Sequence, residues 1–226
     1  RSSDLLSQVG FVEDILCDRA FIEERKDNAQ ELATLEDIAM IGVITPHLLA
    51  NVAAASVLAR SFGIPAEAVK QGIREFRLDR HRIEVVLEHD EITWIDDSKA
   101  TNPHAAAASL ASFDSIVWVV GGLLKGVDVA PLVAKFAPRL RGAVVIGKDR
   151  ELVLEALRAE APSVPVIEIT TDDNDEVMPQ VASSALAFAQ AGDVVLLAPA
   201  AASMDQFKDY ADRGFRFAEA VRALHA

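Results

Sequence analysis

The segment Ile92-Thr-Trp-Ile-Asp-Asp-Ser-Lys-Ala-Thr-Asn-Pro103 leads from an apolar strand, through a polar turn, into a helix. Pro103 suits the first position of that helix, and Asn102 suits its N-cap. The free backbone N–H groups at the helix start favour an anion at the turn, because they point toward it with the positive end of the helix dipole. Six of seven consecutive positions in the turn are polar: Asp96, Asp97, Ser98, Lys99, Thr101 and Asn102. We therefore predict a ligand site here.

Strand and helix patterns alternate from this segment to the end of the chain. Strands are predicted at Ile92–Ile95, Ile116–Val120, Ala143–Ile146, Val166–Ile169 and Val194–Ala198. Helices are predicted at Pro103–Ser112, Val129–Phe136, Arg150–Ala159, Glu176–Ala191 and Met204–Leu224. Several strands are unbroken apolar runs, which is typical of strands that helices cover on both faces. The alternation predicts an α/β fold with a Rossmann-like, doubly wound and mostly parallel sheet.

The residues before this alternation follow another pattern, and we predict a domain boundary near Asp79. A hairpin of Val12–Leu16 and Ala20–Glu23 is expected first. Two helices follow, one over His47–Phe62 and one that begins at Pro65. The first of these helices has an apolar face that is predicted to hold Val52, Ala55, Leu58 and Ala59. After the boundary, an antiparallel ribbon of Ile83–Leu87 and Ile92–Ile95 is expected to turn at Asp90-Glu91.

Composition excludes several classes of protein. The chain has 226 residues, of which 51% are hydrophobic and 25% charged, enough for one large or two small domains. A net charge of −13 argues against a nucleic-acid partner. No apolar run reaches the roughly 18 residues that a membrane span needs. The single cysteine, Cys17, excludes an internal disulfide and favours a reducing compartment, the cytoplasm. Because the chain starts at Arg1 without a Met, we expect it to begin partway through a longer protein.

Ligands of doubly wound sheets bind beyond the carboxyl ends of the strands, so the loops found there identify candidate residues. The second strand is followed by Gly121-Gly-Leu-Leu-Lys-Gly126, in which Lys125 can meet an anion. The third is followed by Gly147-Lys148-Asp149, in which Lys148 is interpreted as a surface lysine. The fifth is followed by Pro199-Ala-Ala-Ala-Ser203.

Ser203 has Gln206 three residues on, which fits a capping box, so the last helix is expected to start at Met204. Lys99, Thr101, Lys125 and Ser203 would then converge at one edge of the sheet. Two ammonium groups and two hydroxyls suit a small molecule that carries carboxylates or phosphates.

Common nucleotide motifs are missing. The Gly121-Gly122 pair lacks the G-x-G-x-x-G spacing, and Gly147-Lys148 lacks the rest of a Walker A loop. The adjacent acids Asp96 and Asp97 are not in the D-x-D order of aspartate-nucleophile phosphatases. They leave open a phosphoryl-transfer receiver or phosphatase as one interpretation. Another is a non-catalytic Rossmann-like module that binds an acidic metabolite.

From about Pro46 to its end, the sequence resembles the C-terminal half of the Mur ligases. The motifs that carry the resemblance are Asp97-Ser-Lys-Ala-Thr-Asn102, Gly121-Gly-Leu-Leu-Lys-Gly126, Leu197-Ala-Pro-Ala-Ala-Ala-Ser203-Met-Asp-Gln-Phe207 and Arg213-Gly214. His81-Arg82-Ile-Glu84 and the His47/Asn51 pair match as well. The members that add D-glutamate to UDP-N-acetylmuramoyl-L-alanine in peptidoglycan synthesis match best.

The resemblance implies a reaction and a domain organisation. In this family ATP phosphorylates a carboxylate, and the amine of an amino acid then attacks the acyl phosphate. Residues 1–78 would be the helical and β tail of a P-loop-type central ATPase domain, and residues 79–226 the Rossmann-like, amino-acid-binding C-terminal domain. The phosphate loop, the Mg²⁺ ligands and the UDP-sugar domain would lie upstream, so this chain is expected to be inactive alone. A monomer is expected.

The resemblance also implies roles for particular residues. The nucleotide would contact Asn51, Arg82, Asp97 and Lys99, with Arg82 near its phosphates. Lys99 and Arg82 would act in catalysis. D-glutamate would contact Thr101, Lys125, Ser203, Met204 and Tyr210. No role carries over to His47, because Leu48 follows it where relatives often have Asn. A hinge that closes when nucleotide binds is expected at Asp79–Arg82.

Overall fold

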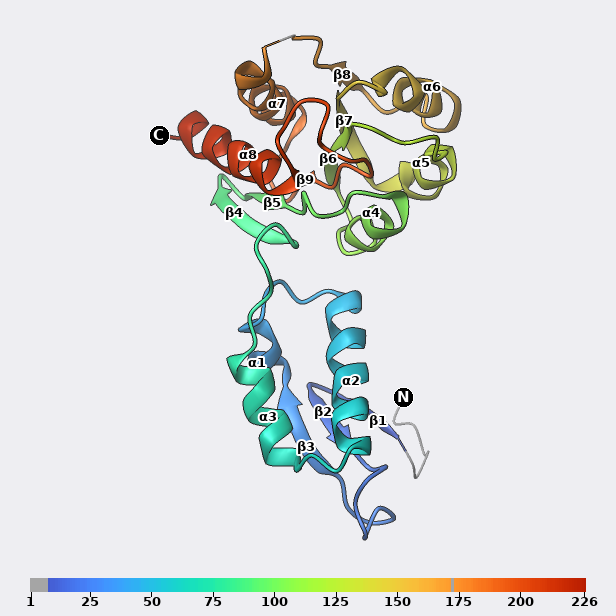
Figure 1. Ribbon diagram of the computed structural model, residues 1–226, viewed down its shortest axis with the longest axis vertical. Coiled ribbons are helices and arrows are strands. Elements are labelled where there is room, and N and C mark those ends of the chain that lie inside the picture. Colours follow the sequence, from blue (N-terminus) through green and yellow to red (C-terminus); the bar gives the residue numbers. More distant parts are fainter. Residues whose placement is uncertain (1–7, 172) are drawn as a thin grey trace. The chain divides into compact units, whose positions relative to one another are not determined.

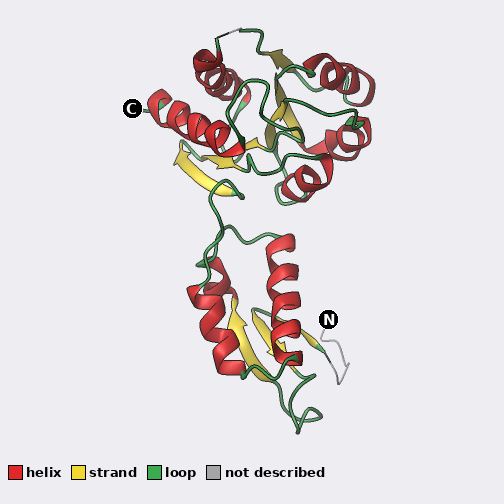
Figure 2. Ribbon diagram, viewed as in Figure 1, coloured by secondary structure: helices red, strands yellow, loops and turns green. Residues whose placement is uncertain are grey.

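The computed structural model describes residues 8–171 and 173–226, and the chain divides into two compact units between Leu78 and Asp79. Figure 1 labels the elements of each unit, and Figure 2 separates helices from strands. Within the described residues, no helix is both long and apolar enough to span a membrane.

The first unit is a three-stranded antiparallel sheet with helices packed on it. Its elements are β1 (Val9–Val12), β2 (Ile15–Asp18), β3 (Gln30–Thr34), α1 (Leu35–Ala39), α2 (Pro46–Ser61) and α3 (Ala66–Glu75). The strand order is β1-β2-β3. Its core joins Leu16 and Leu32 of the sheet to Ile38, Val52 and Ile73 of the helices.

The predicted strands at Val12–Leu16 and Ala20–Glu23 are wrong. The first hairpin turns inside the first of these ranges, where Glu13 has a positive φ of 53°. The second range is not a strand, because the buried Asp18 carboxylate accepts hydrogen bonds from the N–H groups of Ala20 (2.8 Å) and Phe21 (2.9 Å). These bonds bend the chain at the end of β2, and β3 starts later, at Gln30.

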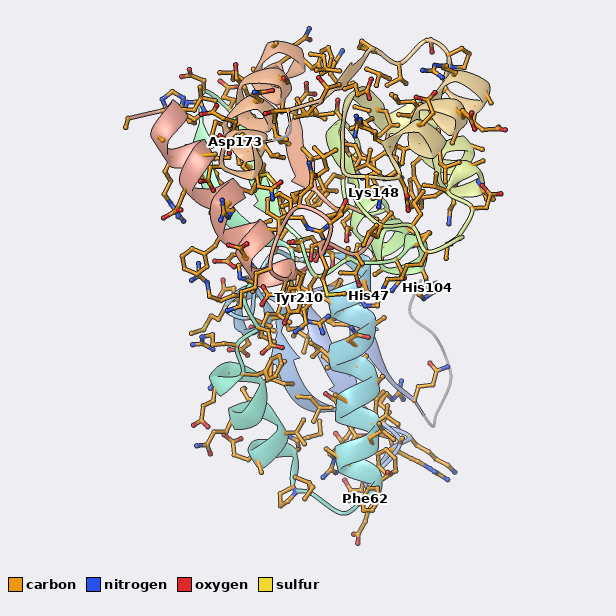
Figure 3. All side chains as sticks on the ribbon, turned by 45° about the horizontal axis from the view of Figure 1, so that its top comes forward. His47, Phe62, His104, Lys148, Asp173 and Tyr210 are labelled. Atoms are coloured by element: carbon orange, nitrogen blue, oxygen red, sulfur yellow. The ribbon has the colours of Figure 1, made fainter. Side chains whose placement is uncertain are left out.

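Both predicted helices of this unit are present, but the first buries a different face than expected. Leu48, Val52 and Ser56 are its buried residues. Leu58 is 63% exposed, so its place on the apolar face is wrong, and Ala55 is exposed as well. Phe62, at the end of α2, is 86% exposed (Figure 3).

The second unit is built on a six-stranded sheet, and its fold class is as predicted. The strands are β4 (Glu84–His89), β5 (Ile92–Asp96), β6 (Ile116–Gly121), β7 (Leu140–Ile146), β8 (Val166–Glu168) and β9 (Val194–Leu197). Their order is β4-β5-β9-β6-β7-β8. Every neighbouring pair is parallel except β4 and β5, which form the predicted antiparallel ribbon. Asp90 and Glu91 both have positive φ at its turn, as tight hairpins require.

Helices cover both faces of this sheet, as the unbroken apolar runs indicated. The helices are α4 (Pro103–Leu110), α5 (Ala130–Phe136), continued by the 3-10 turn η1 (Ala137–Arg139), α6 (Arg150–Glu160), α7 (Asn174–Phe188) and α8 (Tyr210–Leu224). Along β6, Trp118 faces the core formed with α4, α5 and α6. Its neighbours Val117 and Val119 face the core formed with α7 and α8. Figure 1 shows α7 and α8 on one side of the sheet and α4, α5 and α6 on the other.

Helix α4 starts as predicted, whereas α8 does not. Pro103 is the first residue of α4, and the Asn102 side chain accepts a hydrogen bond from the N–H of Ala105 at 2.9 Å. The last helix begins at Tyr210, six residues after the predicted start at Met204. Its N-cap is Asp209, whose carboxylate accepts a hydrogen bond from the N–H of Asp212 at 2.8 Å. An aspartate cap also favours the helix dipole, because it places negative charge at the N-terminus.

Candidate ligand site at the carboxyl edge of the sheet

The topology of the second unit places a switch point between β6 and β9. From β6 the chain moves outward to β7 and β8, and then returns to add β9 on the other side of β6. The loops after these two strands pair with each other through Leu123 and Ala202, with N–H to O distances of 2.9 and 3.0 Å. Ligands of doubly wound folds bind at such a point. The predicted ligand edge is therefore the one at which these loops meet.

Three loops interlock here and form what we call the loop base: residues 121–126, 147–149 and 199–206. A side chain on Gly121 would place its Cβ 2.0 Å from the Ile146 oxygen, and one on Gly122 would come 2.2 Å from the Ala202 oxygen. The Lys148 N–H donates to the Asp205 carboxylate at 2.7 Å. Glycine is required at both positions, and the loop base is a closely packed platform.

The loop after β5 is held by a pair that the sequence interpretation did not single out. His81 and Asp96 are both buried, and the His81 Nδ1 lies 2.6 Å from an Asp96 carboxylate oxygen. The other Asp96 oxygen accepts a hydrogen bond from the N–H of Ser98 at 2.8 Å. Burial raises the pKa of Asp96, although the bonds from His81 and Ser98 oppose that rise. The pair fixes the first turn of the loop.

Arg213 of α8 ties this loop to the loop base. Its side chain is fully buried and donates to the Ser98 hydroxyl (2.9 Å), the Ser98 carbonyl (2.9 Å) and the Ala201 carbonyl (3.1 Å). The Ser98 hydroxyl in turn donates to the Tyr210 carbonyl at 2.7 Å. Burial lowers the pKa of Arg213 to about 10, so the guanidinium stays charged at neutral pH. One side chain thus holds three segments of the site.

Asp97 is buried beside this network. It accepts hydrogen bonds from the Ser109 hydroxyl and from the Ile83 N–H, the latter at 3.3 Å. Burial raises its pKa from 3.8 to about 6, with a smaller rise from the neighbouring Asp96 charge, while the Ser109 and Ile83 bonds and Arg82 lower it. Asp96 and Asp97 are 1% and 6% exposed and are engaged with protein groups. This burial disfavours the phosphoryl-transfer receiver.

The raised pKa of Asp97 predicts a pH dependence of stability. Between 3.8 and about 6 the unfolded chain has released the proton while the folded chain still holds it, so stability falls as pH rises through this window. Asp97→Asn removes this loss. We expect the advantage of the Asn variant over the parent to grow by about 2 kcal/mol between pH 4.5 and pH 7.5. Urea unfolding followed by tryptophan fluorescence measures it, since both tryptophans, Trp94 and Trp118, are buried in this unit.

The control for this experiment is Asp114→Asn, which removes the same charge from a fully exposed side chain that lies 3.6 Å from the Arg139 guanidinium. It measures how much of the difference comes from the change in net charge alone. An Asp97→Asn difference that stayed constant with pH would contradict the raised pKa.

Lys99 is an exposed-tip cation on the loop that follows β5. Its ammonium lies 2.9 Å from the Asp79 carboxylate and 5.4 Å from the centroid of the Tyr210 ring. Tyr210 is the first residue of α8 (Figure 3). The structure therefore brings together two of the predicted site residues, Lys99 and Tyr210, and adds Asp79 to them.

The other predicted residues lie in different surroundings. Arg82 and Lys125 are exposed, and neither forms an ion pair within residues 8–171 and 173–226. Thr101 is half-buried, and Asn51 lies exposed on α2 of the first unit. Lys125 has a positive φ of 55° at the turn of its loop. These side chains are available to a ligand, but their positions do not by themselves assign a role.

Ser203 is buried, but it does not cap a helix as predicted. Its carbonyl accepts hydrogen bonds from the N–H groups of Gln206 (3.2 Å) and Phe207 (2.9 Å), which close a single turn. Met204 is 65% exposed in that turn. The predicted helix N-terminus at Met204 is therefore wrong, and the dipole of α8 does not act there. What Ser203 offers a ligand is its hydroxyl.

One group of possible metal ligands occurs within the described residues: His81, Glu84 and Asp96. These groups bind one another, because the Glu84 carboxylate accepts the His81 N–H at 2.8 Å and Asp96 bonds to the His81 ring. We assign no metal to them.

The structural roles of His81, Asp96 and Arg213 were not predicted, although all three residues belong to segments that the sequence analysis quoted. For Arg213 the sequence also carries a signal of burial. Arg213 precedes Phe217 and Val221 by one and two helical turns, so an arginine shares the buried face of α8.

The comparison with known families decides the assignment of the chain. The family model described as "Mur ligase, glutamate ligase domain" matches residues 81–201, which is more than half of the chain. The chain belongs to the Mur ligase family. The resemblance that the motifs indicated is therefore correct. Membership of this family favours the ligase interpretation over the non-catalytic metabolite-binding module and over the phosphoryl-transfer receiver.

Curated Mur ligases cover nearly all of the chain. A UDP-N-acetylmuramoylalanine–D-glutamate ligase of Leifsonia xyli subsp. xyli is 54% identical over 215 residues, which are 95% of this chain and 42% of that protein. A protein of the same name from Streptomyces avermitilis is 56% identical over 220 residues, with 97% and 46% covered. The chain thus spans less than half the length of these relatives.

Solved structures of Mur-type ligases share the fold. A pseudomurein peptide ligase from Methanothermus fervidus has a TM-score of 0.64 at 12% identity and covers 95% of the chain and 41% of its own. A UDP-N-acetylmuramate–alanine ligase from Thermotoga maritima has a TM-score of 0.56 at 19% identity, with 80% and 39% covered. At this identity the likeness concerns the fold alone.

Proposed function

We propose that the chain is part of an ATP-dependent ligase that adds D-glutamate to UDP-N-acetylmuramoyl-L-alanine in peptidoglycan synthesis. The observation that supports it is the arrangement of the three Mur motif loops, which follow β5, β6 and β9 and are bonded together at one edge of the sheet. Residues 1–78 would belong to the central ATPase domain and residues 79–226 to the amino-acid-binding domain. Such an enzyme would work in the cytoplasm as a monomer. It would supply a precursor of the cell wall, on which cell shape and cell division depend.

In the proposed reaction the substrate carboxylate attacks the terminal phosphorus of ATP, and ADP leaves. The amine of D-glutamate, in its neutral form, then attacks the carbonyl carbon of the acyl phosphate. The C–N bond forms, the C–O bond to phosphate breaks, and the amine loses a proton. Charge grows on phosphate oxygens in both steps, so fixed cations accelerate them.

The nucleotide side of the site would use exposed and half-buried cations. Lys99 and Arg82 would stabilise the phosphoryl oxygens. Mg²⁺ would neutralise the phosphates of ATP when bound. His81, Glu84 and Asp96 bind each other and are not assigned to it. As the resemblance to the Mur ligases implies, its ligands would lie upstream of this chain.

The amino-acid side of the site would bind the two carboxylates of D-glutamate. Lys125 has no ion pair within the described residues, and its loop is bonded to the loop that carries Ser203. The Lys125 ammonium and the Ser203 hydroxyl would bind one carboxylate, and Thr101 would bind the other. Met204 and the ring of Tyr210 would bound the pocket.

Calorimetric titration of the 226-residue chain with D-glutamate tests this assignment, with L-glutamate as the stereochemical control. We expect weak binding that favours the D-isomer and falls at least about tenfold in Lys125→Met, because a charge-assisted bond is lost. Ser203→Ala should weaken binding less, since it removes one neutral donor. Lys148→Met is the matched control, because this exposed lysine uses only its backbone in the loop base.

Equal affinity for both isomers, or a loss in Lys148→Met as large as in Lys125→Met, would contradict the assigned pocket. A folded chain that binds no D-glutamate would show that these residues do not form the pocket without further parts of the enzyme.

A further inference from the structure

Asp79 occupies the donor groups of Lys99 at the place where a ligand anion is expected. The two side chains form one ion pair at 2.9 Å, through a single carboxylate oxygen. Lys99 is 25% exposed and Asp79 is 71% exposed, so solvent and ligands reach the pair. The backbone of Lys99 is held, because its N–H donates to the His81 carbonyl at 3.2 Å. The backbone of Lys99 is therefore held in place, while its ammonium group remains accessible to a ligand.

Asp79 stands between two anchored neighbours. Leu78 packs against the core of the first unit. Arg80 is anchored in the second unit, where its guanidinium lies 4.7 Å from the centroid of the Phe215 ring and 3.3 Å from the Glu84 carboxylate. Within residues 8–171 and 173–226, the Asp79 side chain makes no other hydrogen bond or ion pair than the one to Lys99. This ion pair is what attaches the Asp79 side chain to the second unit.

The Asp79–Lys99 pair is an ion pair at neutral pH, but a competing anion can break it easily. The hydrogen bond and charge of Lys99 lower the pKa of Asp79, so the carboxylate is ionised at neutral pH and competes for the ammonium. An exposed pair with one contact is weak and is screened by salt. A phosphate group offers more charge and more acceptor oxygens than this carboxylate. It should therefore replace Asp79 at Lys99.

We propose that Asp79 is a resident counter-anion that the anionic group of a ligand displaces from Lys99, and that this displacement frees the residue that joins the two units. The proposal rests on the proposed function in taking Lys99 as a ligand-binding cation. It places the predicted hinge of Asp79–Arg82 at Asp79, because the side chains of Arg80 and the buried His81 are held in the second unit. By thermodynamic linkage, breaking the Asp79–Lys99 pair must strengthen anion binding by the same free energy by which anion binding favours breaking the pair.

Binding of inorganic triphosphate to the full chain, followed by two-dimensional NMR of the Lys99 and linker signals, tests the proposal. This probe carries phosphate charge without a nucleoside, so its binding does not depend on ligase activity. We expect Asp79→Asn, which keeps the shape of the side chain, to bind it about two- to fivefold more tightly than the parent. The gain should shrink as salt is raised.

Two further variants separate the local effect from the change in net charge. Asp114→Asn removes one charge from a fully exposed carboxylate on the turn before β6, so it should tighten binding much less. In a Lys99→Gln background, Asp79→Asn should give no gain, because the group it competes for is gone.

The carboxylate signal of Asp79 gives an independent readout. The ¹³Cγ resonance of Asp79 should shift when triphosphate binds, because the carboxylate loses the Lys99 ammonium as its partner, and it should shift in the same direction in Lys99→Gln without triphosphate. Unchanged or weaker triphosphate binding by Asp79→Asn, a gain that persists without Lys99, or no binding to any variant would overturn the proposal. None of these results measures D-glutamate binding, so the amino-acid pocket stands or falls separately.

Discussion

Replacing Arg213 by methionine should lower the free energy of unfolding of the second unit by about 2–4 kcal/mol. The guanidinium donates to two carbonyls and one hydroxyl in a fully buried position. Methionine fills much of the volume but leaves the carbonyls of Ser98 and Ala201 without these donors, at about 1–3 kcal/mol for each buried acceptor. Relief of the buried charge offsets part of this loss. Urea unfolding at pH 7, followed by tryptophan fluorescence, measures the difference.

Arg222→Met is the matched control, because this arginine lies exposed near the end of the same helix. Its effect should remain within about 0.5 kcal/mol. A loss below about 1 kcal/mol in Arg213→Met would mean that desolvation of the guanidinium costs nearly as much as its three hydrogen bonds contribute. In that case Arg213 would not be the residue that holds the three segments together.

Gly214→Ala should destabilise the second unit by a similar amount, about 2–4 kcal/mol. A Cβ at this position would lie 2.3 Å from the His81 Nδ1 and 2.4 Å from an Asp96 carboxylate oxygen. Both side chains are buried and bonded to each other, so they cannot move aside without breaking the pair that fixes the β5 loop. The gain in helix propensity from alanine, about 1 kcal/mol, is smaller than this clash. The same fluorescence assay applies.

Gly192→Ala separates the clash from the usual cost of changing a glycine. This residue has a positive φ of 89°, but a Cβ there would meet nothing within 4 Å. Its replacement should cost about 1–2 kcal/mol, from backbone strain alone. If Gly214→Ala cost no more than Gly192→Ala, the close packing of α8 on the His81–Asp96 pair would be refuted.

The sheet and most helices of the second unit could be predicted because their signals are local. An apolar run such as Ile116–Val120 has few alternatives to a strand buried on both faces. Asn102 and Pro103 predict the start of α4 from two neighbouring positions. The loops at the carboxyl edge follow from the alternation of strands and helices, without any knowledge of side-chain contacts.

The start of α8 could not be predicted, because two capping signals compete over seven residues. Ser203 with Gln206 satisfies the capping-box pattern, and Asp209 with Asp212 offers an acidic cap. The choice is made outside the helix. Ala202 is bonded to Leu123 of another loop, and this pairing commits the chain around Ser203 to a turn. Tertiary structure decides between signals that the local sequence leaves equal.

The network around Arg213 escaped prediction for a related reason. Its partner Ser98 lies 115 residues away in the sequence, and His81 meets Asp96 across 15 residues. Such pairs become visible once the strand order is known. The prediction of the first hairpin was wrong because of a contact between near neighbours in the sequence. The Asp18 carboxylate accepts hydrogen bonds from backbone N–H groups that a strand would have used.

The glycines of the loop base have a consequence for inhibitor design. At Gly121 and Gly122 any larger residue would collide with backbone oxygens at 2.0 and 2.2 Å, and backbone cannot be trimmed by mutation. A compound that bound against the loop base would therefore meet a backbone shape that substitutions at these two buried glycines cannot change without unfolding it. Resistance would then have to arise at side chains farther from the compound, such as those that line its route of entry.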